Sequence, residues 1–579
     1  MRVKHALGYQ NYEKMMDNHI FYVDKTDFIR EWWDNADEVT LITRPRRFGK
    51  TLNMSTVECF FSNQYKEKSY LFEGKKVWEN EEMRRLHGEF PVIFMSFAGA
   101  KSGYNAEAGG EESLDCIESM KTAVKKIIVR TYKEFSDMMK SDLFDDNDRE
   151  YFASIRKDMP DEAAATSISI LSTYLEKYYG KKVIILLDEY DTPMQEAWVY
   201  GYWNKAVAFF RSFFVNTFKD NKSMERGLIT GITRISKESI FSELNHLKVV
   251  TTTSNKYALS FGFTEQEVFD ALDDAGFGSE KKTVKKWYDG FTFGRYTDIY
   301  NPWSIAAFME NDAKYEAYWA NTSANSLVNS LIQRGSKAVK RTVEDLLAGK
   351  SFQAQIDEQI VFNQLEGNEN AVWSLLLATG YLKVIDTEPF SGDRENEPYY
   401  TLVLTNREVR MMFKNMVKGW FSGDSVQTVY NDFIQAMLDD NVRMMNAFMN
   451  KVALHTFSSF DSGNKPSEEA EPERFYHGFV LGMVVNMADA YEVRSNRESG
   501  FGRYDVMLEP RNQDGKAFIF EFKVLNPYED EQTLADTLAA AHRQIEEKKY
   551  ETELIARGFA PERIRKYGFA FQGKQCLIG

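Results

Sequence analysis

The stretch LITRPRRFGKTL, residues 41–52, ends an apolar run and then sets a glycine, a lysine and a threonine in succession. That succession closes the pattern G-x-x-x-x-G-K-[S/T] of a loop that binds phosphate groups. Gly49, Lys50 and Thr51 match the pattern, whereas Arg44 stands at the position of its first glycine. Because such a loop joins a strand to a helix, the apolar run before it and the helical pattern after it fit the same interpretation.

A second apolar run, VIILLDEYD at residues 183–191, ends in acidic residues. Its unbroken hydrophobicity predicts a central strand that is buried on both faces of a parallel sheet. Asp188 at the end of this strand would hold a magnesium ion, and Glu189 would polarise the water that attacks a nucleoside triphosphate. The alternative is an ordinary strand that ends in an acidic turn. A phosphate loop and such a strand in one chain favour a site for ATP and Mg²⁺.

Further residues around this site follow from their positions. The run RGLITGITRIS, residues 226–236, predicts a third strand, and Arg234 near its end either supplies positive charge to the transition state or is a surface arginine. Arg44 is compatible with a phosphate cradle as long as that position does not need a positive φ. The side chains of Arg46 and Arg47 either add charge around the phosphates or lie in solvent. The expected nucleotide-binding residues are Arg44, Arg47, Phe48, Gly49, Lys50, Thr51 and Asp188, with Thr51 and Asp188 on the metal ion.

The order of elements predicts an α/β fold. Short apolar runs alternate with helical patterns, which is typical of a parallel sheet of βαβ units. The predicted strands are 39–43, 90–97, 182–190 and 226–233. Residues 101–180 form either an insertion or a flanking layer of helices. We expect three domains: a phosphate-loop NTPase domain over 1–260, a mostly helical region over 261–465 and a small α/β domain over 466–579, with the polar stretch 458–473 as the linker.

The composition limits what the chain does. With 579 residues it exceeds one hydrophobic core, and its net charge of −15 argues against a broadly basic coat for nucleic acid, although it leaves room for a local basic cleft. Three scattered cysteines are too few for a disulfide framework or a four-cysteine zinc site. No apolar stretch reaches the length of a membrane span, and the N-terminus has no signal-peptide pattern. We therefore expect a cytoplasmic protein with no membrane partner.

The run AFIFEFKVL, residues 517–525, carries a second set of chemical groups. Side chains alternate between the two faces along a strand. The alternate phenylalanines therefore share a face that should be core. Glu521 and Lys523 lie on the opposite face, where they either pair as a salt bridge or form a site.

Taken together, these segments resemble a known family. The segments FYVDKTDFIREWW, RPRRFGKTLNMS, LLDEYDTP, GLITGITRISKESIFSELNHL, FGFTEQEV, WYDGFTFG and YNPWSI are similar in combination to the AAA-ATPase-like family of bacterial proteins. The resemblance covers nearly the whole chain. It implies that the arginine-rich loop is the usual form in this family and that a nuclease-like domain follows at the C-terminus.

The C-terminal segment also resembles the PD-(D/E)XK nuclease superfamily, a restriction-endonuclease-like α/β fold, because Asp505 precedes Glu521 and Lys523 in the pattern D…E-x-K. Asp505 and Glu521 would bind Mg²⁺ or Mn²⁺ through oxygen, and the metal would activate a water. Lys523 would orient that water or stabilise the developing anion. By the same resemblance, Glu473 matches an acidic residue of the first helix, which we expect at the metal, and Gln544 matches a polar residue on the helix after the strand.

Two functional hypotheses stay open at this stage. In the first, binding or turnover of ATP gates or positions the cleavage of nucleic acid by the metal-dependent domain. In the second, the protein is a nucleotide-dependent switch or scaffold, and its nuclease-like domain only binds a partner. Both a monomer and an oligomer are compatible with the sequence.

The two hypotheses make different demands on the strands that carry the metal ligands. Asp514-Gly515 is a two-residue hairpin signal. A strict turn there would pair Asp505 with Val524, on the phenylalanine face. Because cross-strand partners share a face, a metal site requires a register of the other parity. We therefore expect an odd-length loop, or a bulge near Pro510, that shifts the register by one residue and brings Asp505 opposite Lys523.

Overall fold

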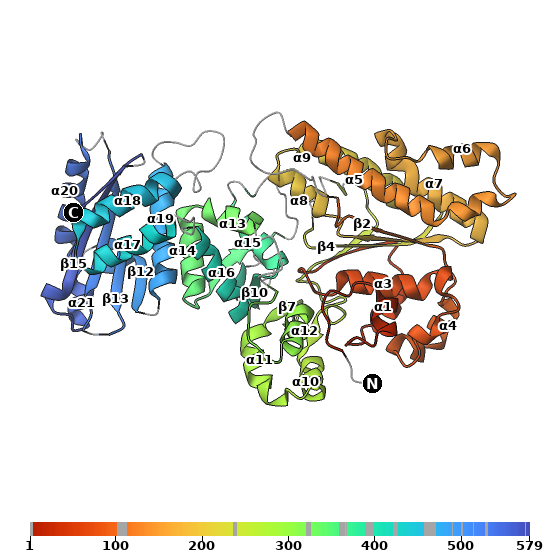
Figure 1. Cartoon of the computed structure of the whole chain (residues 1–579), viewed down its shortest axis with the longest axis horizontal. Coiled ribbons are helices and arrows are strands. Elements are labelled where there is room, and N and C mark those ends of the chain that lie inside the picture. The colour runs from red at the N-terminus through yellow and green to blue at the C-terminus, as the bar shows by residue number, and fades with distance from the viewer. Residues whose placement is uncertain are drawn as a thin grey trace, which may run out of the picture. The chain divides into compact units, whose positions relative to one another are not determined.

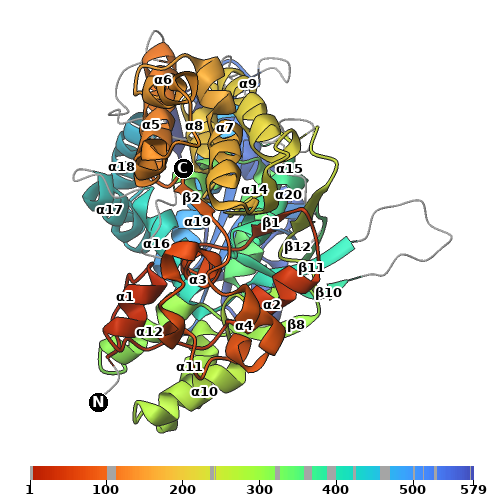
Figure 2. The ribbon, with the colours of Figure 1, turned by 90° about the vertical axis from the view of Figure 1, so that its right-hand side faces the viewer.

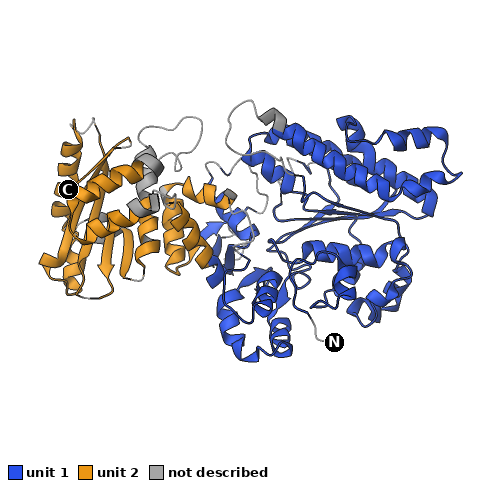
Figure 3. Cartoon of the chain, in the orientation of Figure 1, with its two compact units in different colours: residues 1–323, 353–409 blue, residues 324–352, 410–579 orange. Residues whose placement is uncertain are grey.

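The computed structural model divides the chain into two compact units (Figure 3). The first unit comprises residues 1–323 and 353–409, and the second comprises residues 324–352 and 410–579. The structure describes residues 4–579 except for 101–112, 235–239, 242, 320–325, 358–364, 366–367, 388–398, 421–425, 457–469, 489, 500–501, 513, 527–530 and 574. Most of the expected linker at 458–473 lies outside the described residues. The division into three domains, with boundaries at 260 and 465, stays a prediction.

A five-stranded parallel sheet forms the core of the first unit. In sheet order its strands are β2 (Val92–Ser96), β3 (Val183–Asp188), β4 (Met224–Gly231), β1 (Val39–Thr43) and β5 (Leu247–Val250). Every residue of β1 and β3 is buried, as expected for central strands covered on both faces. The parallel sheet and its four predicted strands are confirmed. The sequence does not predict β5, because this strand has only four residues and one of them is an exposed lysine.

Helices cover both faces of this sheet (Figures 1 and 2). One face carries α1 (Tyr12–Asp17), α2 (Asp27–Asp34), α3 (Lys50–Phe61) and α4 (Glu81–Leu86). The other carries α5 (Ser113–Glu134), α6 (Asp146–Ser154), α7 (Asp161–Tyr179), α8 (Thr192–Val199) and α9 (Trp203–Phe214). The described part of the 101–180 region is therefore a flanking layer. Helix α3 buries Met54, Val57 and Phe60 in a core cluster that includes Ile184 of β3, which fixes the position of the loop before the helix.

The rest of the first unit is mostly helical and contains two small sheets. Its helices are α10 (Glu265–Asp274), α11 (Lys281–Tyr288), α12 (Pro302–Glu310) and α15 (Glu369–Ala378). The sheets have the orders β6-β8-β7 and β10-β11-β9, with strands β6 (Phe263–Thr264), β7 (Phe291–Phe293), β8 (Tyr296–Tyr300), β9 (Phe352–Gln355), β10 (Leu382–Thr387) and β11 (Tyr399–Leu404). The sequence does not predict these strands, because they have no continuous apolar run; β10, for example, is exposed over its second half.

The second unit packs helices on a mixed five-stranded sheet. Its helices are α13 (Ser326–Gln333), α14 (Lys337–Leu347), most of α16 (Arg407–Gly419), α17 (Val426–Leu438), α18 (Val442–Thr456), α19 (Ala470–Met487), α20 (Leu534–Lys548) and α21 (Thr552–Ala556). Its strands, in sheet order, are β12 (Tyr491–Ser499), β13 (Gly502–Pro510), β14 (Ala517–Val524), β15 (Ile564–Gln572) and β16 (Gln575–Ile578).

The predicted α-β-β-α-β core of this unit is confirmed, with two edge strands added to it. The sequence predicts neither β12 nor β16. It also predicts one helix over 531–557, whereas the structure has two, because Lys549 adopts a left-handed backbone with φ of +50° after α20. The alternate phenylalanines of β14 are buried as predicted. In the described part of the chain, no helix is long and apolar enough to cross a membrane.

Candidate nucleotide and metal sites

The loop between β1 and α3 turns into the helix without a glycine at its start. Gly49, immediately before α3, has φ of +82°, a conformation that glycine adopts without steric cost. Arg47 also has a positive φ, of +65°. Arg44 is not among the residues with positive φ. The condition under which an arginine fits at that position is therefore met.

The Arg44 side chain is directed into the fold. It is fully buried, and one guanidinium nitrogen donates to the carbonyl oxygens of Thr43 and Thr251, at 2.9 and 2.5 Å. The guanidinium carbon lies 4.6 Å from the ring centre of Phe293, which makes a cation–π contact. These contacts occupy the side chain that the sequence interpretation assigned to the nucleotide, so Arg44 braces the loop from within.

Lys50, Thr51 and Asp188 meet where α3 begins and β3 ends. Thr51 Oγ1 donates to Asp188 Oδ2 at 2.7 Å, and Lys50 Nζ donates to the carbonyl oxygens of Arg44 and Pro45, both at 2.9 Å. Burial lowers the pKa of Lys50, an effect that the nearby carboxylates oppose. Burial raises the pKa of Asp188, against hydrogen bonds from threonine hydroxyls that include Thr51. An ammonium, a hydroxyl and a carboxylate in this arrangement are the groups that a magnesium nucleotide contacts.

The two acidic residues after Asp188 have different surroundings. Glu189 has φ of +50°, which is uncommon for a residue with a side chain and is a feature of functional sites. Its carboxylate accepts a hydrogen bond from Thr192 Oγ1 at 3.1 Å. Asp191 is fully buried, and its Oδ2 accepts hydrogen bonds from the N–H groups of Ile232 and Thr233 at 3.1 and 2.8 Å. Asp191 therefore ties the end of β3 to the end of β4.

Residues from a later segment hold the arginine-rich loop, and the sequence interpretation assigned them no role. The carbonyl oxygen of Arg46 accepts hydrogen bonds from Asn301 Nδ2 at 3.2 Å and from Trp319 Nε1 at 3.0 Å. The Arg47 guanidinium lies 4.1 Å from the ring centre of Trp303. Asn301 also caps α12, so the sequence NPW marks a helix start, but nothing in the sequence indicates what this helix start contacts.

The other two residues predicted in the first unit lie beside the loop. Phe48 is buried, and its ring centre lies 4.7 Å from that of Phe291 and 5.3 Å from that of Phe293. Arg234 lines a small cavity of about 20 Å³ together with Thr43, at the end of β1, and with Thr251. Phe48 is thus a packing residue, and Arg234 lies near the start of the loop.

In the second unit the register of β13 and β14 brings the predicted carboxylates to one face. Val506 is opposite Phe520 and Met507 is opposite Ile519. One further step of this register brings Asp505 opposite Glu521. The predicted parity is therefore confirmed. The predicted partner, Lys523, is wrong, because the connection over residues 511–516 is wider than a two-residue turn and shifts the register by three residues instead of one.

The carboxylates of this face are held by specific donors. Asp505 Oδ2 accepts a hydrogen bond from the N–H of Phe522 at 2.9 Å. Glu521 is buried, and its Oε1 accepts a hydrogen bond from Gln544 Nε2 of α20. The same nitrogen donates to the hydroxyl of Tyr550 at 3.1 Å. Tyr550 lies beyond the end of α20, so the helical pattern around Gln544 gives no signal for it.

The surroundings of Glu521 fit a divalent cation. Its second oxygen, Oε2, is buried without a hydrogen-bond partner among the described residues. Burial and the neighbouring charge of Asp505 raise the pKa of Glu521 to about 9, while Lys523 and the hydrogen bond from Gln544 act in the opposite direction. A buried carboxylate beside a second carboxylate is stabilised by a cation that both can bind. The oxygen donors suit Mg²⁺ or Mn²⁺.

Two other acidic groups bear on metal binding. Glu473 belongs to α19, but its side chain lies outside the described residues, so its role stays a prediction. In the first unit, Glu265, Asp289 and Asp298 each offer an oxygen within 4.8 Å of the others. Lys285 pairs with all three of these carboxylates, so a lysine ammonium already offsets part of their negative charge.

Comparisons with known proteins bear on both units. Residues 6–241 match the family described as a predicted AAA-ATPase, and residues 471–579 match the PD-(D/E)XK nuclease superfamily. The chain is 24% identical to a protein of Azotobacter chroococcum mcd 1 described as an uncharacterized protein in the vnfD 5′ region, over 100% of this chain and 98% of that protein. Among solved structures it is similar to the Walker-type ATPase PABY2304 of Pyrococcus abyssi, with 12% identity, a TM-score of 0.34, and coverage of 69% of this chain and 97% of that one.

Proposed function

We propose that this chain, which joins an AAA-ATPase-like domain to a domain of the PD-(D/E)XK nuclease superfamily, hydrolyses ATP at the first and cleaves nucleic acid at the second under control of the nucleotide. The observation that carries the proposal is the bond between Thr51 and Asp188, which joins the phosphate loop to the acidic strand end. Three buried cysteines without disulfides suit a reducing cytoplasm, where we place the protein.

At the phosphate loop, each side chain has a separate role in the proposed hydrolysis of ATP. Lys50 exchanges the two loop carbonyls for phosphate oxygens, while Thr51 and Asp188 hold the magnesium ion. Glu189 accepts the proton of the attacking water, and Arg234 offsets charge on the transferred phosphoryl group. Bound magnesium supplies charge neutralisation between the phosphates.

At the second site Asp505 and Glu521 hold Mg²⁺ or Mn²⁺, and Glu473 is a further candidate ligand. When bound, the metal activates water and offsets charge on the scissile phosphate. Lys523 orients the water. Gln544 fixes one oxygen of Glu521 by its hydrogen bond, which leaves the other oxygen for the metal.

Thermal denaturation of the full chain tests the first site. Mg²⁺–ATP should raise the unfolding temperature, because a ligand specific for the native state stabilises it. Lys50→Ala should abolish the shift, whereas Lys182→Ala, at an exposed lysine of the same unit, should retain it. Glu189→Gln should retain the shift and lose turnover by roughly a hundredfold or more. An equal shift in wild type and Lys50→Ala would place the nucleotide elsewhere.

A cleavage assay tests the second site. Wild type should cut single- or double-stranded DNA or RNA in Mg²⁺ or Mn²⁺, and Asp505→Asn should not. A protein that binds ATP but cuts none of these substrates, with or without nucleotide, would favour the rival function of a nucleotide-dependent scaffold that uses the C-terminal domain to bind a partner.

A further inference from the structure

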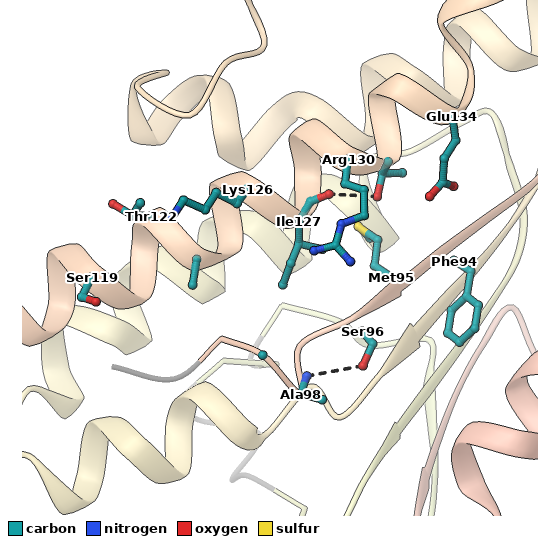
Figure 4. Close-up of a pocket in the computed structure, with 13 residues that line it drawn as sticks. Phe94, Met95, Ser96, Ala98, Ser119, Thr122, Lys126, Ile127, Arg130 and Glu134 are labelled. Atoms are coloured by element: carbon teal, nitrogen blue, oxygen red, sulfur yellow. Dashed lines mark hydrogen bonds between the residues drawn. The ribbon is translucent and has the colours of Figure 1, made fainter. Parts of the chain in front are cut away.

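A groove runs along the outer edge of the parallel sheet in the first unit. Strand β2 is at the end of the sheet order, and in the described part of the chain no strand pairs with its second edge, although Ser62 forms a β-bridge with Phe90 just before β2. The groove has a volume of about 740 Å³ and lies between β2, the turn that follows it and helix α5 (Figure 4). Adding a side chain at Gly99, in that turn, would meet no atom within 4 Å, so this end of the groove is open.

The backbone of β2 presents hydrogen-bonding groups to the groove that no other described residue uses. The N–H of Phe97 donates to the carbonyl of Asp188, and the carbonyl of Pro91 accepts from the N–H of Ile184. Odd-numbered residues of β2 therefore point their backbone groups toward β3. Because these groups alternate between the two edges of a strand, those of Phe94 and Ser96 point away from β3. Such an edge is the template on which an extended peptide adds a strand.

Helix α5 places two cations over this edge, Lys126 and Arg130, and the charge of Arg130 also acts on Glu134 one turn further along. Lys126 and Arg130 line the groove, are exposed, and make no hydrogen bond or ion pair with a described residue. On the same helix, Lys121 and Lys125 pair instead with Asp161, at 2.8 and 2.7 Å. The helix therefore has one set of cations used in the fold and a second set directed at the groove.

The spacing between Lys126 and Arg130 matches the spacing of side chains two residues apart on a strand. Lys126 and Arg130 are four residues apart, which is about 6 Å along a helix. Side chains two residues apart on a strand share a face and are about 6.6 Å apart. Glu134, one turn beyond Arg130, also lines the groove and disfavours a third acidic side chain there.

We propose that this groove binds an extended acidic peptide segment of a partner protein, which adds a strand to the free edge of β2 and places carboxylates at alternate positions on Lys126 and Arg130. The site is distinct from both sites of the proposed function. Main-chain bonds to β2 supply the affinity, and the two cations supply the selectivity for acidic sequences.

Fluorescence anisotropy with the full chain and a labelled peptide of sequence TVEVEVT tests the proposal. The peptide should bind with a dissociation constant below about 1 mM. The peptide TVKVKVT should bind at least tenfold more weakly. Two further peptides carry N-methyl groups, one on both glutamates and the other on the flanking valines. Only one of these two peptides should lose binding, since only one of the two sets of N–H groups faces β2. Equal effects of the two methylations would overturn strand addition.

Variants on α5 complete the test. Lys126→Glu combined with Arg130→Glu should weaken peptide binding at least tenfold, whereas Lys133→Glu, an exposed lysine of the same helix outside the groove, should leave it within twofold of wild type. The stabilisation by Mg²⁺–ATP should persist in all variants, which shows that they fold. Absence of peptide binding overturns the proposal. The proposal is also wrong if a single-stranded oligonucleotide binds in place of the peptide and the double variant loses that binding. It is wrong as well if the chain associates with itself and the double variant abolishes this association.

Discussion

Arg44 carries a full charge into the interior beside the phosphate loop. Its hydrogen-bond partners are carbonyl oxygens, which accept from a guanidinium without adding a negative charge. The aromatic face of Phe293 completes the enclosure. A glycine at this position would remove the guanidinium hydrogen bonds to both carbonyls, although Thr251 would keep the one from the N–H of Ser254, and it would leave the space beside the ring empty. The arginine is therefore part of the core of the loop. Replacing it with the glycine of the common phosphate-loop pattern should not strengthen ATP binding.

Arg44→Gly should lower the free energy of unfolding by at least about 2 kcal/mol, since a hydrogen bond that involves a charged group contributes about 1.5–3 kcal/mol. It should also fail to tighten ATP binding. Denaturant titration and ATP titration measure the two effects. Arg46→Gly is the matched control, because the Arg46 side chain is only partly buried, and it should cost less stability. A more stable Arg44→Gly variant would contradict this interpretation.

His87 makes the stability of the first unit depend on pH. Its ring is buried among Phe60, Phe72 and Trp78, with ring centres 5.3 to 5.7 Å away, and its Nε2 has no partner among the described residues. Burial lowers the pKa of His87. The native state therefore favours the neutral ring, while the unfolded chain takes up a proton near pH 6.5. The free energy of unfolding must then fall as the pH drops below that value.

His87→Phe should remove this part of the pH dependence. Between pH 7.5 and pH 5 the unfolding temperature of wild type should fall by more than that of the variant. The two unfolding temperatures should lie closest together at pH 7.5, where the histidine is neutral in both states. Parallel unfolding temperatures over the whole range would show that His87 does not titrate on unfolding.

At the scale of elements, mostly apolar runs were sufficient to predict the central strands, because β1 and β3 are buried on both faces and carry few polar side chains. A strand of two to four residues is too short to be predicted from such a pattern. Strand β7 has only three residues, too few to show an alternating pattern, although it pairs with β8, the next strand along the chain. The register of β13 and β14 shows the same limit: face sharing follows from parity, but the width of the connection after Pro510 sets which residue is opposite Asp505.

The pairing of β13 and β14 places Asp505 beside the buried Glu521, so a negative charge on both residues is disfavoured when no metal is bound. Glu521→Gln should therefore leave the unfolding temperature in EDTA equal to or above that of wild type, because the neutral amide avoids the free energy needed to protonate the Glu521 carboxylate or to bury it beside Asp505. Mn²⁺ should raise the unfolding temperature of wild type and not that of the variant. An equal rise in both proteins would mean that Glu521 does not hold the metal.

At the scale of the whole molecule, the two chemical sites belong to different compact units. The motifs predicted which residues lie together at each candidate site, since each site depends on a few residues on a strand and the turn after it, while their roles stay proposals. The surroundings of the sites were not predictable in the same way. Asn301 and Trp319 at the phosphate loop, and Tyr550 at the metal site, reach their positions only through tertiary packing.

This separation allows the coupling to be tested directly. Asp505→Asn should abolish cleavage and leave the ATPase rate within about twofold of wild type, because Asp505 belongs to a different compact unit from the nucleotide-binding groups. Lys50→Ala should alter the cleavage rate, although its own unit contains no nuclease residue. Both rates are measured on the same preparations. Cleavage that is unchanged in Lys50→Ala would show that the two sites work independently.

Because the arginine-rich loop contacts two indole rings, tryptophan fluorescence can report on its conformation. Trp303 lies beneath the Arg47 guanidinium, and the Trp319 N–H is bound to the Arg46 carbonyl. Indole emission changes with a neighbouring cation and with the partner of its N–H group. Any rearrangement of the loop around phosphate therefore alters the intrinsic fluorescence of the protein, and Trp303→Phe identifies the share that comes from the ring under Arg47. The chain thus contains its own spectroscopic probe of the nucleotide, with no label attached.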